Sequence, residues 1–139
     1  MKIHAYLTFD GQCEAAFTFY AECLNGSLEL MHFGESPEAE NVPAQFHDRV
    51  IHVCLTSGDQ VLMGADALPG TPYDGIKGCS ISLQVENVPE AERLYEALSA
   101  QGSVQMVLQP TFWATRFAVF TDRFGVSWMI NCTIDAQMG

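Results

Sequence analysis

Alternating hydrophobic and polar positions predict four strands in the first half of the chain, over residues 3–9, 27–33, 49–56 and 60–64. Between the first two strands, apolar residues at helical spacing predict a helix, with Asp10 as its N-cap and Asn25-Gly26 as its end. Residues 34–48 contain three glutamates and two prolines without a regular period, and they predict a long loop of the kind that often forms a lid or is partly disordered.

The second half of the chain repeats this order of elements. A strand is expected over residues 79–85, a helix over 88–100 and a further strand over 103–108. Two strands rich in aromatic and β-branched residues follow, 116–121 and 126–132. Asp122-Arg-Phe-Gly125 lies between them and has the composition of a tight turn, so the two strands are expected to form a hairpin.

Residue identities support an internal duplication. Five identical pairs lie 76 residues apart: Glu14 and Glu90, Ala15 and Ala91, Ala21 and Ala97, Gly26 and Gly102, Ser27 and Ser103. The predicted fold class is therefore α+β, with tandem β-α-β-β-β modules that bury their sheets by pairing. Module one is expected to span residues 1–66, a Pro/Gly-rich linker 67–78 and module two 79–134.

Several sequence motifs resemble the PhnB-like family of the vicinal-oxygen-chelate superfamily (glyoxalases, bleomycin-resistance proteins and dioxygenases). They are Phe19-Tyr20 with Leu24-Asn-Gly26, Phe33-Gly34-Glu35, residues 63–69, Thr111-Phe-Trp113 and residues 122–131 with their Trp-Met-Ile-Asn ending. Members also carry the label 3-demethylubiquinone 3-methyltransferase-like. The common S-adenosylmethionine site needs a Gly-rich turn after a strand, which residues 9–12 and 85–88 lack.

The resemblance implies curved sheets around a cleft, a homodimer and, in most of the superfamily, a metal held by His, Gln or Glu. The corresponding positions here fall near Ala5, near Ser80 or Ile81, near Met63 or Gly64, and near Met129. None is a good ligand for a divalent metal, so no metal or other cofactor is expected. A rearranged divalent-metal site is the alternative, drawn from His4, His32, His47, His52, Asp66 and Glu35.

Charge and length exclude some partners. The 139 residues carry a net charge of −11, which disfavours binding to nucleic acid. No apolar run is long enough to span a bilayer, and the first residues do not resemble a signal peptide, so a cytoplasmic protein without a membrane partner is expected. The five cysteines form no C-x-x-C pair, and most lie in apolar patterns typical of the core.

Seven residues are candidates for a site. His52, in the middle of a strand, and Asp66, just past a strand end, are candidate acid–base residues; an Asp there more often caps a turn. The candidate ligand contacts are Tyr73, which could close over a cleft, together with Trp113, Arg116, Trp128 and Asn131.

Three of these ligand contacts have a structural alternative. Trp113 could form the floor of a cleft, or it could be a core or dimer-interface residue. Arg116 could hold a carboxylate or phosphonate in a bidentate manner, or pair with Asp122, Asp66 or Glu35. Asn131 must find hydrogen-bond partners if it is buried, either as a structural strap or through a ligand.

The expected function is binding of a small oxygenated or anionic metabolite in a cleft, without the usual metal ligands. The alternative is a metal-dependent lyase, isomerase or dioxygenase of the glyoxalase superfamily. The sequence leaves open whether the protein is an enzyme.

Overall fold

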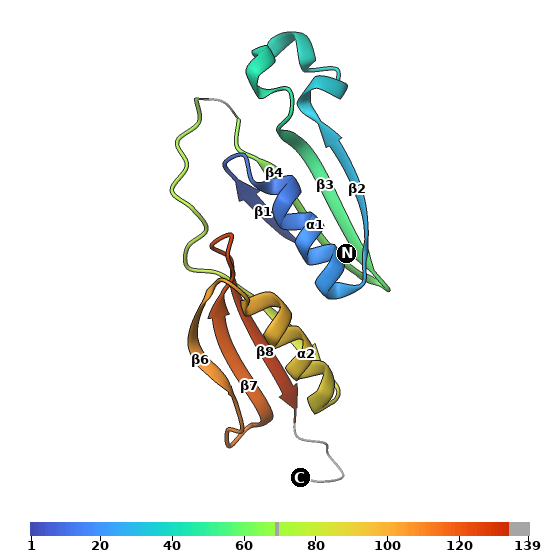
Figure 1. Ribbon diagram of the computed structural model, residues 1–139. Coiled ribbons are helices and arrows are strands. Elements are labelled where there is room, and N and C mark those ends of the chain that lie inside the picture. Colours follow the sequence, from blue (N-terminus) through green and yellow to red (C-terminus); the bar gives the residue numbers. More distant parts are fainter. Residues whose placement is uncertain (69, 134–139) are drawn as a thin grey trace. The chain divides into compact units, whose positions relative to one another are not determined.

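The computed structural model describes residues 1–68 and 70–133 (Figure 1). The chain divides into two compact units between Lys77 and Gly78. Each unit is a four-stranded mixed sheet with one helix, which confirms the predicted α+β class with two β-α-β-β-β repeats. Neither helix in the described residues has the length and apolar character needed to cross a membrane.

The first unit contains a sheet with the strand order β1-β4-β3-β2, in which β1 and β4 run parallel and the other neighbours antiparallel. Three short 3₁₀ helices, η1 to η3, connect β2 to β3. The elements are β1 (Ala5–Phe9), α1 (Cys13–Leu24), β2 (Ser27–His32), η1 (Phe33–Glu35), η2 (Ala39–Asn41), η3 (Ala44–Phe46), β3 (Val50–Ser57) and β4 (Gln60–Asp66).

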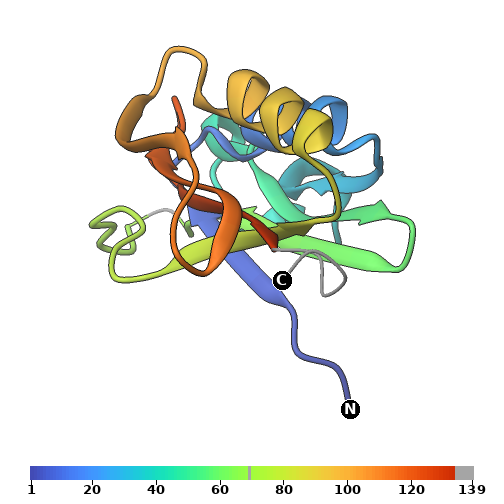
Figure 2. The same ribbon diagram turned by 90° about the horizontal axis from the view of Figure 1, so that it is seen from below.

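The second unit repeats the topology with the order β5-β8-β7-β6, and β5 and β8 are its parallel pair. Its elements are β5 (Ser80–Val85), α2 (Val88–Ser99), β6 (Ser103–Gln109), β7 (Ala114–Thr121) and β8 (Ser127–Thr133). Figures 1 and 2 show each helix lying against one face of its own sheet. In the part of the chain that the structure describes, the other face of each sheet carries no α-helix of its own unit.

Aromatic packing between helix and sheet forms the core of the first unit. Phe17 and Tyr20 on α1 are fully buried, and Phe17 meets Phe9 of β1 in an edge-to-face contact with ring centroids 6.2 Å apart. Such contacts add to the stabilisation from apolar burial. Leu7, Val53, Leu55 and Leu62 are buried in the same unit.

The predicted β7–β8 hairpin is confirmed, with β7 starting two residues earlier than expected and β8 shifted by one residue toward the C-terminus. Asp122 accepts hydrogen bonds at Oδ1 from the backbone N–H groups of Phe124 (2.8 Å) and Val126 (3.0 Å). Gly125 has φ +88°, a conformation that glycine adopts without strain. The turn therefore forms by the local chemistry that its sequence indicates.

Two local predictions in the first unit were wrong. Asp10 does not cap α1, because the N-cap residue is Gln12 and the Asp10 carboxylate accepts instead from Arg49 at 2.8 Å. Residues 34–48 are not a plain loop, since they contain most of η1 and all of η2 and η3. The predicted helix end at Asn25 is confirmed, with Asn25 in the left-handed conformation at φ 53°.

Candidate functional site

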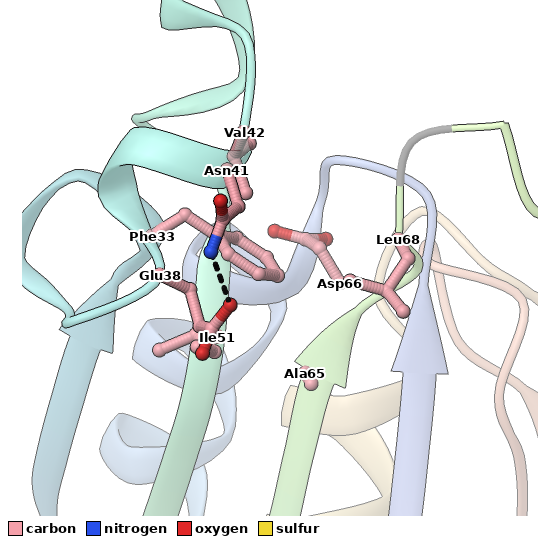
Figure 3. Close-up of a pocket in the computed structure, with 8 residues that line it drawn as sticks. All are labelled: Phe33, Glu38, Asn41, Val42, Ile51, Ala65, Asp66 and Leu68. Atoms are coloured by element: carbon pink, nitrogen blue, oxygen red, sulfur yellow. Dashed lines mark hydrogen bonds between the residues drawn. The ribbon is translucent and has the colours of Figure 1, made fainter.

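The first unit contains a pocket of about 460 Å³ at the end of the sheet where β4 stops (Figure 3). One wall comes from the segment that connects β2 to β3, and the other from β3, β4 and the residues that follow β4. The lining residues are Phe33, Glu38, Asn41, Val42, Ile51, Ala65, Asp66 and Leu68.

Backbone hydrogen bonds to one histidine hold the first wall together. The Nε2 atom of His47 lies 2.9 Å from the carbonyl oxygen of Ala39 and 2.8 Å from that of Val42. Because both partners are acceptors, Nε2 must carry the proton and donate to them. The amide N–H of Gly34 in turn donates to the His47 carbonyl at 3.0 Å. These bonds fold an irregular sequence into a defined wall.

The carboxylate of Asp66 joins three parts of the first unit. Its Oδ1 accepts from the backbone N–H groups of Gly11 (2.8 Å) and Cys13 (3.1 Å), and its Oδ2 accepts from that of Val50 (2.9 Å). The residue is 4% exposed. Asp66 thus ties the start of α1 and the start of β3 to the end of β4. This geometry favours the turn-capping alternative over a general base.

Acidic and neutral groups supply the polar part of the pocket. Glu38 and Asp66 are its two charged lining residues, and the Asn41 amide donates to Glu38 at 3.2 Å. No Lys, Arg or His side chain is among the described residues that line this pocket. The remaining residues are apolar. The pocket therefore offers hydrogen-bond acceptors and negative charge beside an apolar surface.

His32 lies between two glutamates and directly precedes the pocket wall in sequence. Nε2 of His32 lies 2.6 Å from Glu14 of α1, and Nδ1 lies 2.5 Å from Glu35 of η1. The hydrogen bond to Glu14, followed by that to Glu35, raises the pKa of His32. The bonds from His32 lower the pKa of Glu35. The next residue after His32 is Phe33, which lines the pocket.

The His32 contacts predict that stability falls as pH rises past neutrality. A raised folded-state pKa contributes stability that is fully present below the unfolded value of about 6.5 and is lost as pH rises through the folded value. We expect wild type to lose more unfolding free energy between pH 6 and 9 than His32→Gln does, by urea denaturation. His4→Gln, at an exposed position, is the control and should follow wild type. Equal pH dependence in wild type and His32→Gln would contradict this.

The candidate base His52 pairs with a tyrosine that the sequence did not single out. Tyr6 Oη lies 3.1 Å from His52 Nδ1, and the two rings lie 5.9 Å apart between centroids. Both side chains are exposed, on the sheet face away from α1. The part of Tyr6 that is buried, followed by the charge of Cys13, raises the pKa of Tyr6. His52 follows the pocket residue Ile51 in sequence but does not itself line the pocket.

Tyr73 is tied to the first sheet. Its hydroxyl donates to the carbonyl oxygen of Thr8 at 2.7 Å, and burial, followed by the charges of Asp10 and Asp66, raises its pKa. Tyr73 is not a lining residue of the pocket. Its predicted role over a ligand stays a prediction.

The tryptophans of the second unit differ in exposure. Trp128 is fully buried, and its indole N–H donates to Asp122 at 2.8 Å, which favours a core role over ligand contact. Trp113 is 45% exposed and packs edge-on against Phe112 and Phe117, with ring centroids 4.7 and 5.2 Å apart. Trp113 therefore keeps free surface for a partner or ligand.

The other two candidates lie on β7 and β8. Arg116 donates to the carbonyl of Thr115 at 2.7 Å. The Asn131 amide donates to Gln84 at 2.8 Å, while its buried Oδ1 has no hydrogen-bond partner in the described chain. Asn131 is thus partly a structural strap, and the ligand roles of both residues stay predictions.

The structure gathers only one of the predicted residues, Asp66, at the pocket. The others lie elsewhere on the first unit (His52 and Tyr73) or on the second unit (Trp113, Arg116, Trp128 and Asn131). Most lining residues were missed. Their signal was the irregular segment 34–48, which was predicted as lid-like without indicating which of its side chains face inward.

The positions that correspond to superfamily metal ligands do not fit a divalent metal. Across β1 and β4, Ala5 stands opposite Leu62 and Tyr6 opposite Met63. In the second sheet Met129 stands opposite Ser82. Within residues 1–68 and 70–133, no three His, Cys, Asp or Glu side chains are grouped so as to hold a metal ion. The residues at the inherited positions therefore do not fit a divalent metal. The described His, Cys, Asp and Glu side chains also do not form a rearranged site with three such ligands.

Comparisons with known proteins agree with the fold. The family model described as "Glyoxalase/Bleomycin resistance protein/Dioxygenase superfamily" matches residues 2–130. Protein YjdN of Escherichia coli (strain K12) is 36% identical over 140 residues, covering 94% of this chain and 95% of YjdN.

Two solved structures extend the comparison. The crystal structure of PA1353 from Pseudomonas aeruginosa is 53% identical, covers 97% of this chain and 99% of its own, and has a TM-score of 0.90. A PhnB protein from Bacillus cereus, described as a putative 3-demethylubiquinone-9 3-methyltransferase, shares the fold at 22% identity, with a TM-score of 0.79 and coverage of 96% and 100%. The chain belongs to the glyoxalase/bleomycin resistance protein/dioxygenase superfamily and is a homologue of YjdN.

Proposed function

We propose that this protein binds a small molecule in the pocket of the first unit, and that the ligand has an apolar body and a hydrogen-bond-donating group. The observation that carries the proposal is the lining of the pocket, which combines Phe33, Val42 and Ile51 with the carboxylate of Glu38 and contains no cationic side chain. A volume of about 460 Å³ is in the usual range for small-molecule sites.

The negative charge of the pocket lining distinguishes anionic ligands from oxygenated or cationic ones. An anionic metabolite would meet Glu38 and Asp66 without a counter-charge, in a chain whose net charge is −11. An oxygenated ligand with hydroxyl donors, or an amine, satisfies the same groups. Of the two ligand types expected from the sequence, the pocket therefore favours the oxygenated one over the anionic one. Its negative charge also suits a cationic ligand.

A matched pair of probes tests this preference. Benzylamine and benzoate have similar apolar bodies and opposite charge, and calorimetric titration measures binding of each to the full chain. We expect benzylamine to bind and benzoate not to bind. Tighter binding of benzoate would contradict the proposed ligand class.

Two glutamates of η2 and its flank provide a control for the site. Glu38→Gln should weaken benzylamine binding about fivefold, the scale of a partly solvated ion pair. Glu40→Gln removes the same charge two residues away, outside the pocket lining, and should change the affinity less. Equal effects of the two variants would indicate only the general negative field of the protein.

We further propose that the protein forms a homodimer. Support comes from the surface of the second unit, where Val104, Val107, Phe112 and Trp113 are exposed and residues 97–121 contain no Asp or Glu. On a chain of charge −11, exposed apolar side chains in a stretch that has no acidic residue and includes the cationic Arg116 lie where a second copy meets least repulsion. Sedimentation equilibrium of wild type and Val107→Glu tests it: a wild-type monomer would rule the dimer out.

A further inference from the structure

The open face of the first sheet carries a group of soft donor atoms. Along β3, Val53 and Leu55 are buried on the side of α1, so His52 and Cys54 lie on the opposite face. Met31 of β2, 45% exposed, and Met63 of β4 belong to the same open face. We call His52, Cys54, Met31 and Met63 the soft-donor cluster.

Strand register places these four side chains side by side. Met31 is the Cα partner of His52 across β2 and β3, and Met63 is the partner of Cys54 across β3 and β4. Side chains directly opposite on one face have Cβ atoms about 4.5–5.5 Å apart, and diagonal neighbours remain within reach of long side chains. His52 and Cys54 are two positions apart on one strand. One imidazole, one thiol and two thioethers therefore share a small area.

We propose that the soft-donor cluster binds a monovalent soft cation, Cu(I), through Cys54, His52 and a methionine sulfur. Thiolate and thioether ligands select Cu(I), whereas Mg²⁺ and Ca²⁺ require oxygen ligands. Of its four members, only His52 and Cys54 belong to the His, Cys, Asp and Glu types from which most protein metal sites are built. The other two members are thioethers. It is separate from the pocket of the first unit, and the two proposals can fail independently.

Tyr6 supplies the outer contact that a histidine ligand usually has. Ligating histidines generally donate their second ring N–H to a neighbouring oxygen, which fixes the ring. With the proton on Nδ1, His52 donates to Tyr6 Oη at 3.1 Å and leaves the Nε2 lone pair for the cation. Glu29, the partner of Cys54 on β2, adds negative charge to the same face.

Within residues 1–68 and 70–133, Cys54 is the cysteine that lies in such a cluster. Cys13, Cys23 and Cys132 are buried, and burial, followed by the charges of Asp66 and Glu14, raises the pKa of Cys13 to about 12. Cys79 is exposed and would bind Cu(I) as an isolated thiol. Binding at Cys54 replaces the thiol proton by the cation and releases that proton to solvent.

Anaerobic titration of the reduced full chain with Cu(I), in competition with the chromophoric chelator bicinchoninate, tests the site. The Cys79→Ser chain serves as the parent, because it removes the isolated exposed thiol. We expect it to bind one Cu(I) per chain, and at least tenfold more weakly after Cys54→Ser. His52→Gln and Met31→Leu should each weaken binding by a smaller factor.

Silver(I) gives an independent readout on the unmodified protein. Bound Ag(I) should protect Cys54 from iodoacetamide more strongly than it protects Cys79, as measured by mass spectrometry of the two peptides. Unchanged Cu(I) affinity after Cys54→Ser would overturn the proposal. So would equal protection of Cys54 and Cys79, since that outcome means only non-specific binding to thiols.

Discussion

Replacing Asp66 by Ala should destabilise the first unit by about 4 kcal/mol. The change removes three hydrogen bonds from backbone N–H groups to a buried carboxylate. Hydrogen bonds to charged groups each contribute about 1.5–3 kcal/mol, and N–H groups left buried without a partner add to the loss. Urea denaturation followed by circular dichroism measures the change in unfolding free energy.

Two variants separate the hydrogen bonds from the charge. Asp66→Asn keeps the shape but presents an N–H group to one set of donors, so we expect a loss smaller than that of Asp66→Ala and still above 1 kcal/mol. Asp59→Ala removes an exposed carboxylate that accepts from Gln60, and should change stability by less than about 0.5 kcal/mol. A loss below 1 kcal/mol for Asp66→Ala would contradict the structural role of the carboxylate.

Gly102→Ala should destabilise the second unit by about 3 kcal/mol. A Cβ at this position would lie 2.1 Å from the carbonyl oxygen of Thr121 and 3.0 Å from backbone atoms of Asp122. Backbone atoms cannot move aside as a flexible side chain can, so β6 must shift away from β7 or the main chain must distort. We therefore expect a cost at the upper end of the range for overpacked positions. Thermal and urea unfolding of the full chain measure the effect.

Gly58→Ala is the matched control, because Gly58 is required by its backbone conformation and not by a close backbone neighbour. Gly58 has φ +61° and no atom within 4 Å of a built Cβ, so its replacement costs only the left-handed conformation, about 1 kcal/mol. If Gly102→Ala proves no more harmful than Gly58→Ala, close backbone approach is not the reason for glycine at position 102.

The same close approach explains part of the sequence repeat. At Gly26, which matches Gly102, a Cβ would lie 2.9 Å from the carbonyl oxygen of Thr56. Both glycines therefore sit where the chain leaves a helix and passes close to the end of another strand. This shared steric requirement accounts for the glycine pair among the five identical pairs of the repeat.

Elements determined by local pattern were predicted well. The β7–β8 hairpin follows from alternating apolar residues and a turn whose Asp122 bonds its own backbone. The α1 end follows from Asn25 in the left-handed conformation. Such features depend on neighbours in sequence, so they can be identified without the fold.

Features that depend on distant residues could not be predicted. The start of α1 is capped by Asp66, which is 53 residues from Cys13, and not by the nearby Asp10. The pocket wall depends on His47 donating to carbonyls of an irregular segment, a pattern without sequence periodicity. Trp128 was predicted as a ligand contact from its residue type, but it is buried in the core and its indole N–H donates to Asp122.

Chemical-shift mapping of benzylamine binding by ¹H–¹⁵N correlation spectroscopy tests the central claim, that the pocket of the first unit is the ligand site. We expect the largest shifts at the amides of Phe33, Asn41, Val42 and Ala65, all of which line the pocket, and loss of these shifts in Ala65→Phe, which fills it. Shifts concentrated at Trp113, Arg116 and Asn131 would contradict the claim and place the ligand on the second unit.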